Sequence, residues 1–173
     1  MSNFVNDRNK KCTNGISRNL EKLPDYCLDF ILGIENNTSS LTRLNYSQDL
    51  VIFFDYLSNN VFSKPAKDIT FADLDTLKAR NFEQYLSYLS YYEYNNKQYS
   101  NGEKGKARKL ATVRTFFKYN FKRDNIKSDV TSKIEKVKQY GNIFSKFRRF
   151  IYELKEKYYL NYSLRFIFLF SSL

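Results

Sequence analysis

Basic residues crowd into the segment Gly102 to Arg123, GEKGKARKLATVRTFFKYNFKR, which contains eight basic residues and one acidic residue. Residues 1–101 hold 11 basic and 12 acidic residues, a net charge of −1, so the excess that gives the whole chain +11 begins abruptly here. Basic side chains at a helix start repel one another and the positive end of the helix dipole. A polyanion offsets this cost, because each Lys or Arg on a phosphate adds to affinity. The segment therefore predicts a nucleic-acid contact, with a solvated helix face as the alternative.

The same segment has the spacing of an amphipathic helix. Its inward stripe is expected to consist of Leu110, Val113, Phe117 and Phe121, which recur at helical intervals. A second face carries Lys104, Arg108, Thr112 and Thr115, with Lys106 and Lys109 on either side. Arg108 and Lys109 can reach either phosphates or guanine edges, and the spacing does not separate these two modes.

A second group of candidate contacts lies at the start of a helix expected over residues 40–58. Thr42, Arg43 and Tyr46 fall within about one turn of its N-terminal half. Hydroxyl groups, a guanidinium and backbone N–H groups at a helix start all bond to phosphate oxygens. The alternative is a capped surface helix with Tyr46 half-buried.

Several kinds of chemistry are excluded by composition. The chain has no histidine, which removes His-based metal sites and His-activated nucleophiles. Asp68 and Asp73 are typical of helix caps and first-turn charges, and no phosphate-binding loop is recognisable. Cys12 and Cys27 are expected to be reduced thiols of an intracellular protein. We therefore predict no catalytic residue, no metal, no cofactor and no small-molecule substrate.

The elements that position these residues are expected to be four helices in an all-α bundle. They cover about residues 24–35, about 40–58, a longer helix after Thr70 that carries Phe82 and Leu86, and the basic segment. Residues 1–21 are expected to form a polar, irregular arm. Residues 139–173 form an aromatic-rich tail whose last apolar run is too short to cross a bilayer. We expect a cytoplasmic protein with no membrane partner.

Three segments in order resemble the core-binding, SAM-like N-terminal domain of tyrosine recombinases, the Xer/phage-integrase family. They are SSLTRLNYSQDLVIFFDYL, DITFADLDTL and GKARKLATVRTFFKYNFKRDNIKSDV. The pattern of the first is matched by Thr42, Tyr46, Asp49 and Leu50. The pattern of the third is matched by Arg108, Leu110, Ala111, Thr112, Val113, Arg114, Phe116 and Phe117. The resemblance covers about residues 22–138 and implies a four-helix domain that forms half of a clamp around double-stranded DNA.

The resemblance also implies which residues face the DNA major groove. These are Thr42, Arg43, Tyr46, Lys106, Arg108, Lys109, Thr112 and Arg114, with Lys104 as a flanking phosphate contact. For Arg114, an ion pair with an Asp or Glu is the alternative. Other recombinase protomers are implied as further partners.

The family's catalytic domain, which carries arginines, a lysine, histidines and a tyrosine nucleophile, is not matched by the tail. We therefore expect a DNA-binding fragment for integration and recombination that is not an enzyme alone, from a truncated or frame-disrupted recombinase gene. The alternative is a structural or regulatory module that binds another protein through the aromatic C-terminal segment.

Overall fold

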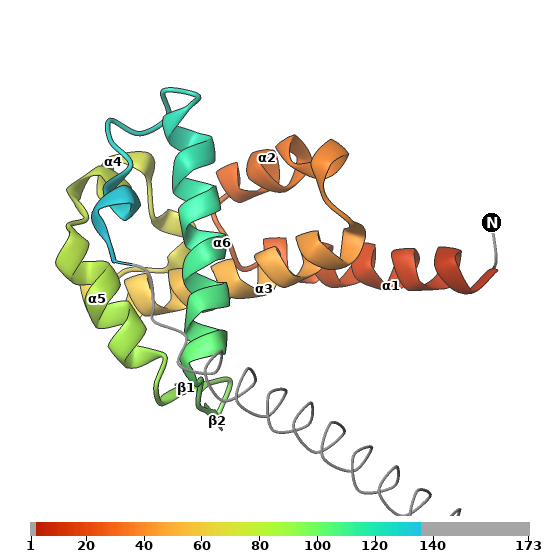
Figure 1. Ribbon diagram of the computed structural model, residues 1–173, viewed down its shortest axis with the longest axis horizontal. Helices are drawn as coiled ribbons and strands as arrows, with labels where there is room; N and C mark the ends of the chain where they lie inside the picture. Colours follow the sequence, from red (N-terminus) through yellow and green to blue (C-terminus); the bar gives the residue numbers. More distant parts are fainter. Residues whose placement is uncertain (1–2, 136–173) are drawn as a thin grey trace, which may run out of the picture. The chain divides into compact units, whose positions relative to one another are not determined.

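The computed structural model describes residues 3–135, which form six α-helices and a short β-hairpin (Figure 1). The elements are α1 (Asn3–Leu20), α2 (Tyr26–Gly33), α3 (Ser40–Leu57), α4 (Phe71–Thr76), α5 (Ala79–Tyr88), β1 (Tyr92–Tyr94), β2 (Lys97–Tyr99) and α6 (Glu103–Phe121). The expected all-α bundle is confirmed. No helix in this range is both long and apolar enough to cross a membrane. The predicted aromatic tail, residues 139–173, lies outside the described residues.

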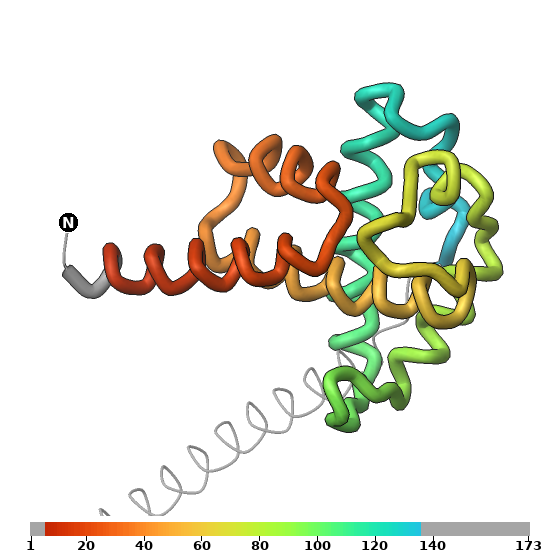
Figure 2. The backbone as a smooth tube through the Cα atoms, turned by 180° about the vertical axis from the view of Figure 1, so that it is seen from behind, coloured from red at the N-terminus to blue at the C-terminus, as the bar shows by residue number. Residues whose placement is uncertain are grey.

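Helix α3 is the centre of the arrangement, with α1 alongside it and α6 crossing it (Figures 1 and 2). It begins at Ser39, whose hydroxyl oxygen accepts a hydrogen bond from the Thr42 backbone N–H at 3.2 Å. From Asp49 to Phe54 every residue is buried. A helix that is enclosed on most sides is apolar nearly all round, which explains why this segment lacks a clean amphipathic stripe.

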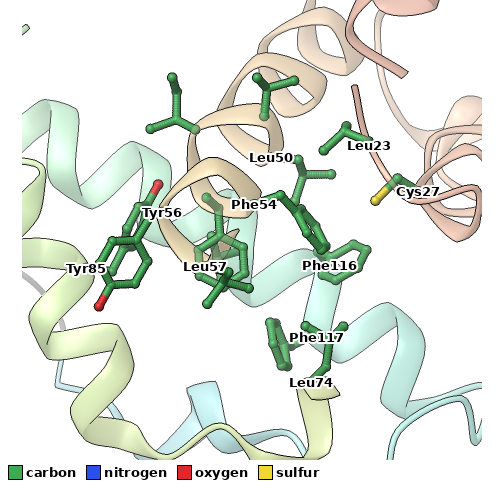
Figure 3. Close-up of a cluster of buried hydrophobic side chains, with 14 of the residues drawn as sticks. Leu23, Cys27, Leu50, Phe54, Tyr56, Leu57, Leu74, Tyr85, Phe116 and Phe117 are labelled. Atoms are coloured by element: carbon green, nitrogen blue, oxygen red, sulfur yellow. The ribbon is translucent and has the colours of Figure 1, made fainter. Parts of the chain in front are cut away.

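The core is formed mainly by α2, α3, α5 and α6, and its largest side chains are aromatic (Figure 3). Phe82 of α5 packs edge to face on Phe117 of α6, with ring centroids 5.3 Å apart. Phe54 of α3 meets Phe116 of α6 in the same manner at 5.9 Å. Edge-to-face pairs add to the free energy gained from burial alone and fix the orientation of each ring. This packing holds α6 against α3 and so determines which side of α6 reaches solvent.

The long third helix that the sequence predicts is in fact two short helices. Leu77 and Lys78 have extended backbone between α4 and α5. Leu77 is buried in the core, and the Asn81 side chain accepts a hydrogen bond from the Lys78 backbone N–H at 2.9 Å. The second helix therefore has its own N-terminal cap, which a search for apolar periodicity does not detect.

The start of α4 gives the fold a pH-dependent element. Burial raises the pKa of Asp73, but hydrogen bonds from Lys64 and Thr70 and the Lys64 charge outweigh it and lower the pKa to about 2. We expect Asp73→Ala to lower the free energy of unfolding at pH 7 by about 1 kcal/mol. Because the folded pKa lies below the unfolded one, this contribution should be present above about pH 4 and disappear as the pH falls towards 2. Urea denaturation across that range measures it, and a loss that did not change with pH would contradict the assignment.

The prediction of an irregular N-terminal arm is wrong in its conformation, because residues 3–20 form α1. Cys12 and Ile16 lie one turn apart on α1, and both side chains are buried. Cys12 is a free thiol. Asn19 donates a hydrogen bond to the Ser47 hydroxyl at 2.9 Å, so α1 and α3 are joined by polar contacts too. Cys12 and Ile16 alone give too short a stripe to be recognised without the neighbouring helix.

The polar segment before α6, expected as a loop, contains the hairpin of β1 and β2. Tyr92 pairs with Tyr99 and Tyr94 with Lys97 in antiparallel register. Asn95 and Asn96 at the turn have φ values of 51° and 57°. Positive φ at both central residues is typical of the tight turns that connect hairpin strands, and Asn tolerates it well.

Candidate nucleic-acid interface

A buried carboxylate joins the two helices that carry the predicted DNA contacts. Asp49 of α3 is 0% exposed and accepts hydrogen bonds from three side chains of α6. Arg108 Nη1 lies 2.6 Å from Oδ2, Thr112 Oγ1 lies 2.8 Å from the same oxygen, and Lys109 Nζ lies 3.0 Å from Oδ1. A buried charge is stable only when it is paired and hydrogen-bonded, and here both oxygens are occupied. These four residues are the Asp49 cluster.

The Asp49 cluster corrects two of the predicted contacts. Lys109 is 7% exposed and Thr112 is 0% exposed, and both hydrogen-bond inward to Asp49. Neither side chain can touch DNA from this position, so their role is to position α6. Arg108 differs, because its side chain is 51% exposed although it also bonds to Asp49. Its guanidinium is therefore fixed by the protein and still accessible.

Two tyrosines lie near this carboxylate. Tyr85 of α5 has a buried hydroxyl group with no hydrogen-bond partner among the described residues. Burial, followed by the charge of Asp49, raises its pKa well above the usual value. Burial and the Asp49 charge also raise the pKa of Tyr92, and the Asn101 hydrogen bond and the Arg108 charge oppose this. Both hydroxyls therefore stay protonated at neutral pH.

The solvent-facing side of α6 is a single row of small and basic residues. Its members recur every three or four positions and are Lys104, Arg108, Ala111, Thr115, Lys118 and Lys122, the last at the C-cap. All are exposed except Thr115, which is half-buried and bonds back to the Ala111 carbonyl at 2.9 Å. We call this row the α6 stripe. It contains no acidic residue.

The α6 stripe differs from the face that the sequence predicts. The prediction grouped Lys104, Arg108, Thr112 and Thr115. Three of these belong to the stripe, whereas Thr112 lies toward the core and Ala111 toward solvent. Lys118 and Lys122 belong to the stripe and were not recognised as candidates. The sequence does indicate them, because the helical spacing of three and four residues that starts at Lys104 continues to Lys118 and Lys122.

The α3 candidates have mainly structural contacts. Arg43 forms an ion pair with Glu35 at 2.8 Å, and its side chain is 14% exposed. The Tyr46 ring lies nearly parallel to that of Phe30, with centroids 6.2 Å apart. Thr42 is half-buried, and its hydroxyl lies 2.9 Å from that of Ser39. Among the described residues, Arg43 has an ionic partner and Tyr46 an aromatic one. Thr42, in the first turn of α3, has neither.

Two further predicted contacts on α6 also have internal partners. Lys106 lies 3.5 Å from the Glu103 carboxylate and is mostly covered. Arg114 donates hydrogen bonds to the backbone carbonyl oxygens of Ile134 and Glu135, at 2.5 and 3.3 Å. Arg114 therefore has an internal partner, but that partner is main chain and not the Asp or Glu carboxylate given as the alternative. The interface that remains consists of the α6 stripe and the start of α3.

Other chemistry finds no support in the part of the chain that the structure describes. No three carboxylate or cysteine side chains there gather closely enough to hold a metal ion. Asp73 is a charge in the first turn of α4, as predicted, and it also forms a capping box with Thr70.

Comparison with known proteins agrees with this geometry. The model of the phage integrase SAM-like domain matches residues 22–135, which is the region from the turn before α2 to the last described residue. Comparisons with curated proteins and with solved structures give no match. The matched domain is not the catalytic domain of integrases, and α1 precedes it. Because the match covers well over half of the chain, the chain belongs to the phage integrase SAM-like domain family.

Proposed function

We propose that this chain binds double-stranded DNA, as a recombination-related protein that does not itself cleave or rejoin strands. The observation that carries the proposal is the α6 stripe, where Lys104, Arg108, Lys118 and Lys122 face solvent with no acid between them. Among residues 6–135, none of the three lysines forms an ion pair. The family supports a role in integration and recombination, and residues 22–138 are the unit to which we assign binding.

The shape of the stripe suits a phosphate backbone. Lys104 and Lys122 are 18 residues apart, which spans about 27 Å along a helix. Between them Ala111 and Thr115 are small, so the helix can approach a groove closely while its basic side chains reach phosphates on either side. Asp49 holds the Arg108 guanidinium in place, so less side-chain entropy is lost when it contacts the ligand.

Binding of this kind is governed mainly by charge. The four phosphate contacts of the α6 stripe contribute about −3.6 to the slope of the logarithm of the association constant against the logarithm of salt concentration. We expect an affinity in the non-specific range, about micromolar or weaker at physiological salt.

Fluorescence anisotropy of a labelled duplex, titrated with the full chain at several salt concentrations, measures both quantities. Two duplexes of unrelated sequence serve as the control for sequence preference. Absence of binding at low salt, or an affinity that did not depend on salt, would contradict the proposal.

A further inference from the structure

Helix α1 lies outside the region that matches the family and packs on the helix that begins the proposed DNA surface. Ser40 at the start of α3 donates a hydrogen bond to the Asn9 side chain at 2.7 Å, and Asn19 reaches Ser47 at 2.9 Å. These contacts are in the same order along both helices, so α1 and α3 run parallel, side by side (Figure 1). Whatever α1 presents to solvent is therefore fixed relative to α3.

Four basic residues of α1 and of the turn that follows it lie on one side of the helix. Arg8, Lys11, Arg18 and Lys22 follow one another at intervals of three, seven and four residues, with Gly15 at the centre of the series. This spacing puts them on one side of a helix, and all four are exposed. We call them the α1 basic row. Of the two acidic residues of this segment, Glu21 lies on another side together with Lys10, whereas Asp7 lies one turn before Lys11, at the edge of the row.

The fold itself does not use the α1 basic row for ionic contacts. Within residues 6–135 none of its four members forms an ion pair. Arg8 and Lys11, three residues apart, repel one another, and Asp7, four residues before Lys11, offsets part of that repulsion. Cys12 and Ile16 already provide the buried contact with α3, and Gly15 provides a close approach to Leu44. Packing of α1 therefore leaves the basic row unexplained.

The row leads toward the start of α6. Lys22 at its end lies 3.1 Å from the Tyr94 hydroxyl group, and its ammonium group is 5.5 Å from the centre of the same ring. Tyr94 belongs to the hairpin that directly precedes α6. Between the two basic helices, α3 leaves Leu41, Asn45 and Gln48 uncovered or half-covered, and none of these is charged. Among the described residues, this side of α3 has no acidic side chain to separate the α1 basic row from the α6 stripe.

We propose that the α1 basic row binds the phosphate backbone of the same DNA duplex that the α6 stripe contacts. From Arg8 to Lys22 the row spans about 21 Å, which corresponds to about six base pairs at 3.4 Å each. Because it offers only cationic groups, it adds affinity and a longer footprint, and it does not add sequence preference. This proposal rests on the proposed function, since it requires that α6 contacts DNA.

The test uses single variants of the full chain in the salt titration described above. Lys11→Gln and Arg18→Gln each remove one contact, so each should reduce the salt slope by about 0.9 and weaken binding about eightfold at 0.1 M salt. Lys10→Gln is the matched control, because it removes the same charge from another side of the same helix and should leave the slope unchanged. Lys11→Arg, which keeps the charge, should bind as the wild type does. Circular dichroism verifies that helix content is equal in all four variants.

Each outcome decides the proposal. Equal losses for Lys10→Gln and Lys11→Gln would show that net charge alone matters, and would overturn it. Wild-type binding by Lys11→Gln and Arg18→Gln, combined with loss in an α6 stripe variant, would overturn it and leave the proposed function standing. No DNA binding by the wild-type chain would overturn both.

Discussion

Replacing Asp49 with Asn is expected to lower the free energy of unfolding by about 3–5 kcal/mol, because it removes the only anion from a cluster that contains two cations. Lys109, 7% exposed, would then have no charge partner, and burying an unpaired ammonium group is costly. Arg108 can turn to solvent because half of its side chain is already exposed, but Lys109 cannot without disturbing α6. The loss should therefore come mainly from Lys109.

Urea denaturation followed by circular dichroism measures this effect, and the chain provides a matched control. Asp55 lies on the same helix, is half-buried, and forms no ion pair with another described residue, so Asp55→Asn should change the free energy of unfolding by less than about 0.5 kcal/mol. The double variant Asp49→Asn/Lys109→Met should lose less free energy of unfolding than the sum of the losses in the two single variants. The difference, which is the coupling energy, should be about 1–3 kcal/mol. Equal losses for Asp49→Asn and Asp55→Asn would contradict the role of the cluster.

Replacing Lys104, Lys118 and Lys122 together with Gln is expected to weaken DNA binding about 500-fold at 0.1 M salt. Each lysine that contacts a phosphate releases counterions, which raises the association constant by about 0.9 of a decade at 0.1 M salt. Three such contacts raise it by about 2.7 decades. All three side chains are exposed and have no ion pair among the described residues, so stability should change by less than about 1 kcal/mol. From an affinity near the micromolar range, such a loss removes measurable binding.

The control for this triple variant removes the same charge elsewhere. Lys67, Lys78 and Lys127 are exposed and lie outside α6, so their replacement with Gln leaves the stripe intact. The control protein should keep nearly all of its affinity in the anisotropy measurement. If both triple variants lost affinity equally, binding would depend on net charge and not on the α6 stripe.

The sequence predicts much of the fold because local signals and tertiary packing agree over most of the chain. Helix α3 was expected at about 40–58 and is found at Ser40–Leu57, with Ser39 as its N-cap and Leu50, Phe53, Phe54 and Leu57 buried. Helix α6 was predicted as well, with Leu110, Val113 and Phe117 buried as expected. Phe121, predicted to face inward with them, is exposed at the end of the helix. Helix α1 was not predicted, because Cys12 and Ile16 are buried only through packing against α3, and two apolar residues do not make a recognisable helical pattern.

The site was predicted less completely, for a different reason. Lys109 and Thr112 have the types of side chain that bind phosphate, and no local pattern distinguishes them from exposed neighbours. Their orientation is decided by Asp49, about sixty positions earlier in the chain, which reaches them only after α3 and α6 cross. The family pattern did include Asp49, but a matched position does not reveal its partners. The sequence therefore predicts the right helix and most of its solvent-facing side, but it places Thr112 on that side although the side chain is buried.

The Asp49 cluster has a consequence for the rate at which a ligand arrives. It contains one negative and two positive charges, so it retains one excess positive charge although Lys109 never reaches the surface. A charge surrounded by protein is screened less by dissolved ions than one surrounded by water, and its potential extends further. The cluster thus acts as a fixed source of positive potential behind Arg108. It should draw polyanions toward the start of α6 before any side chain makes contact.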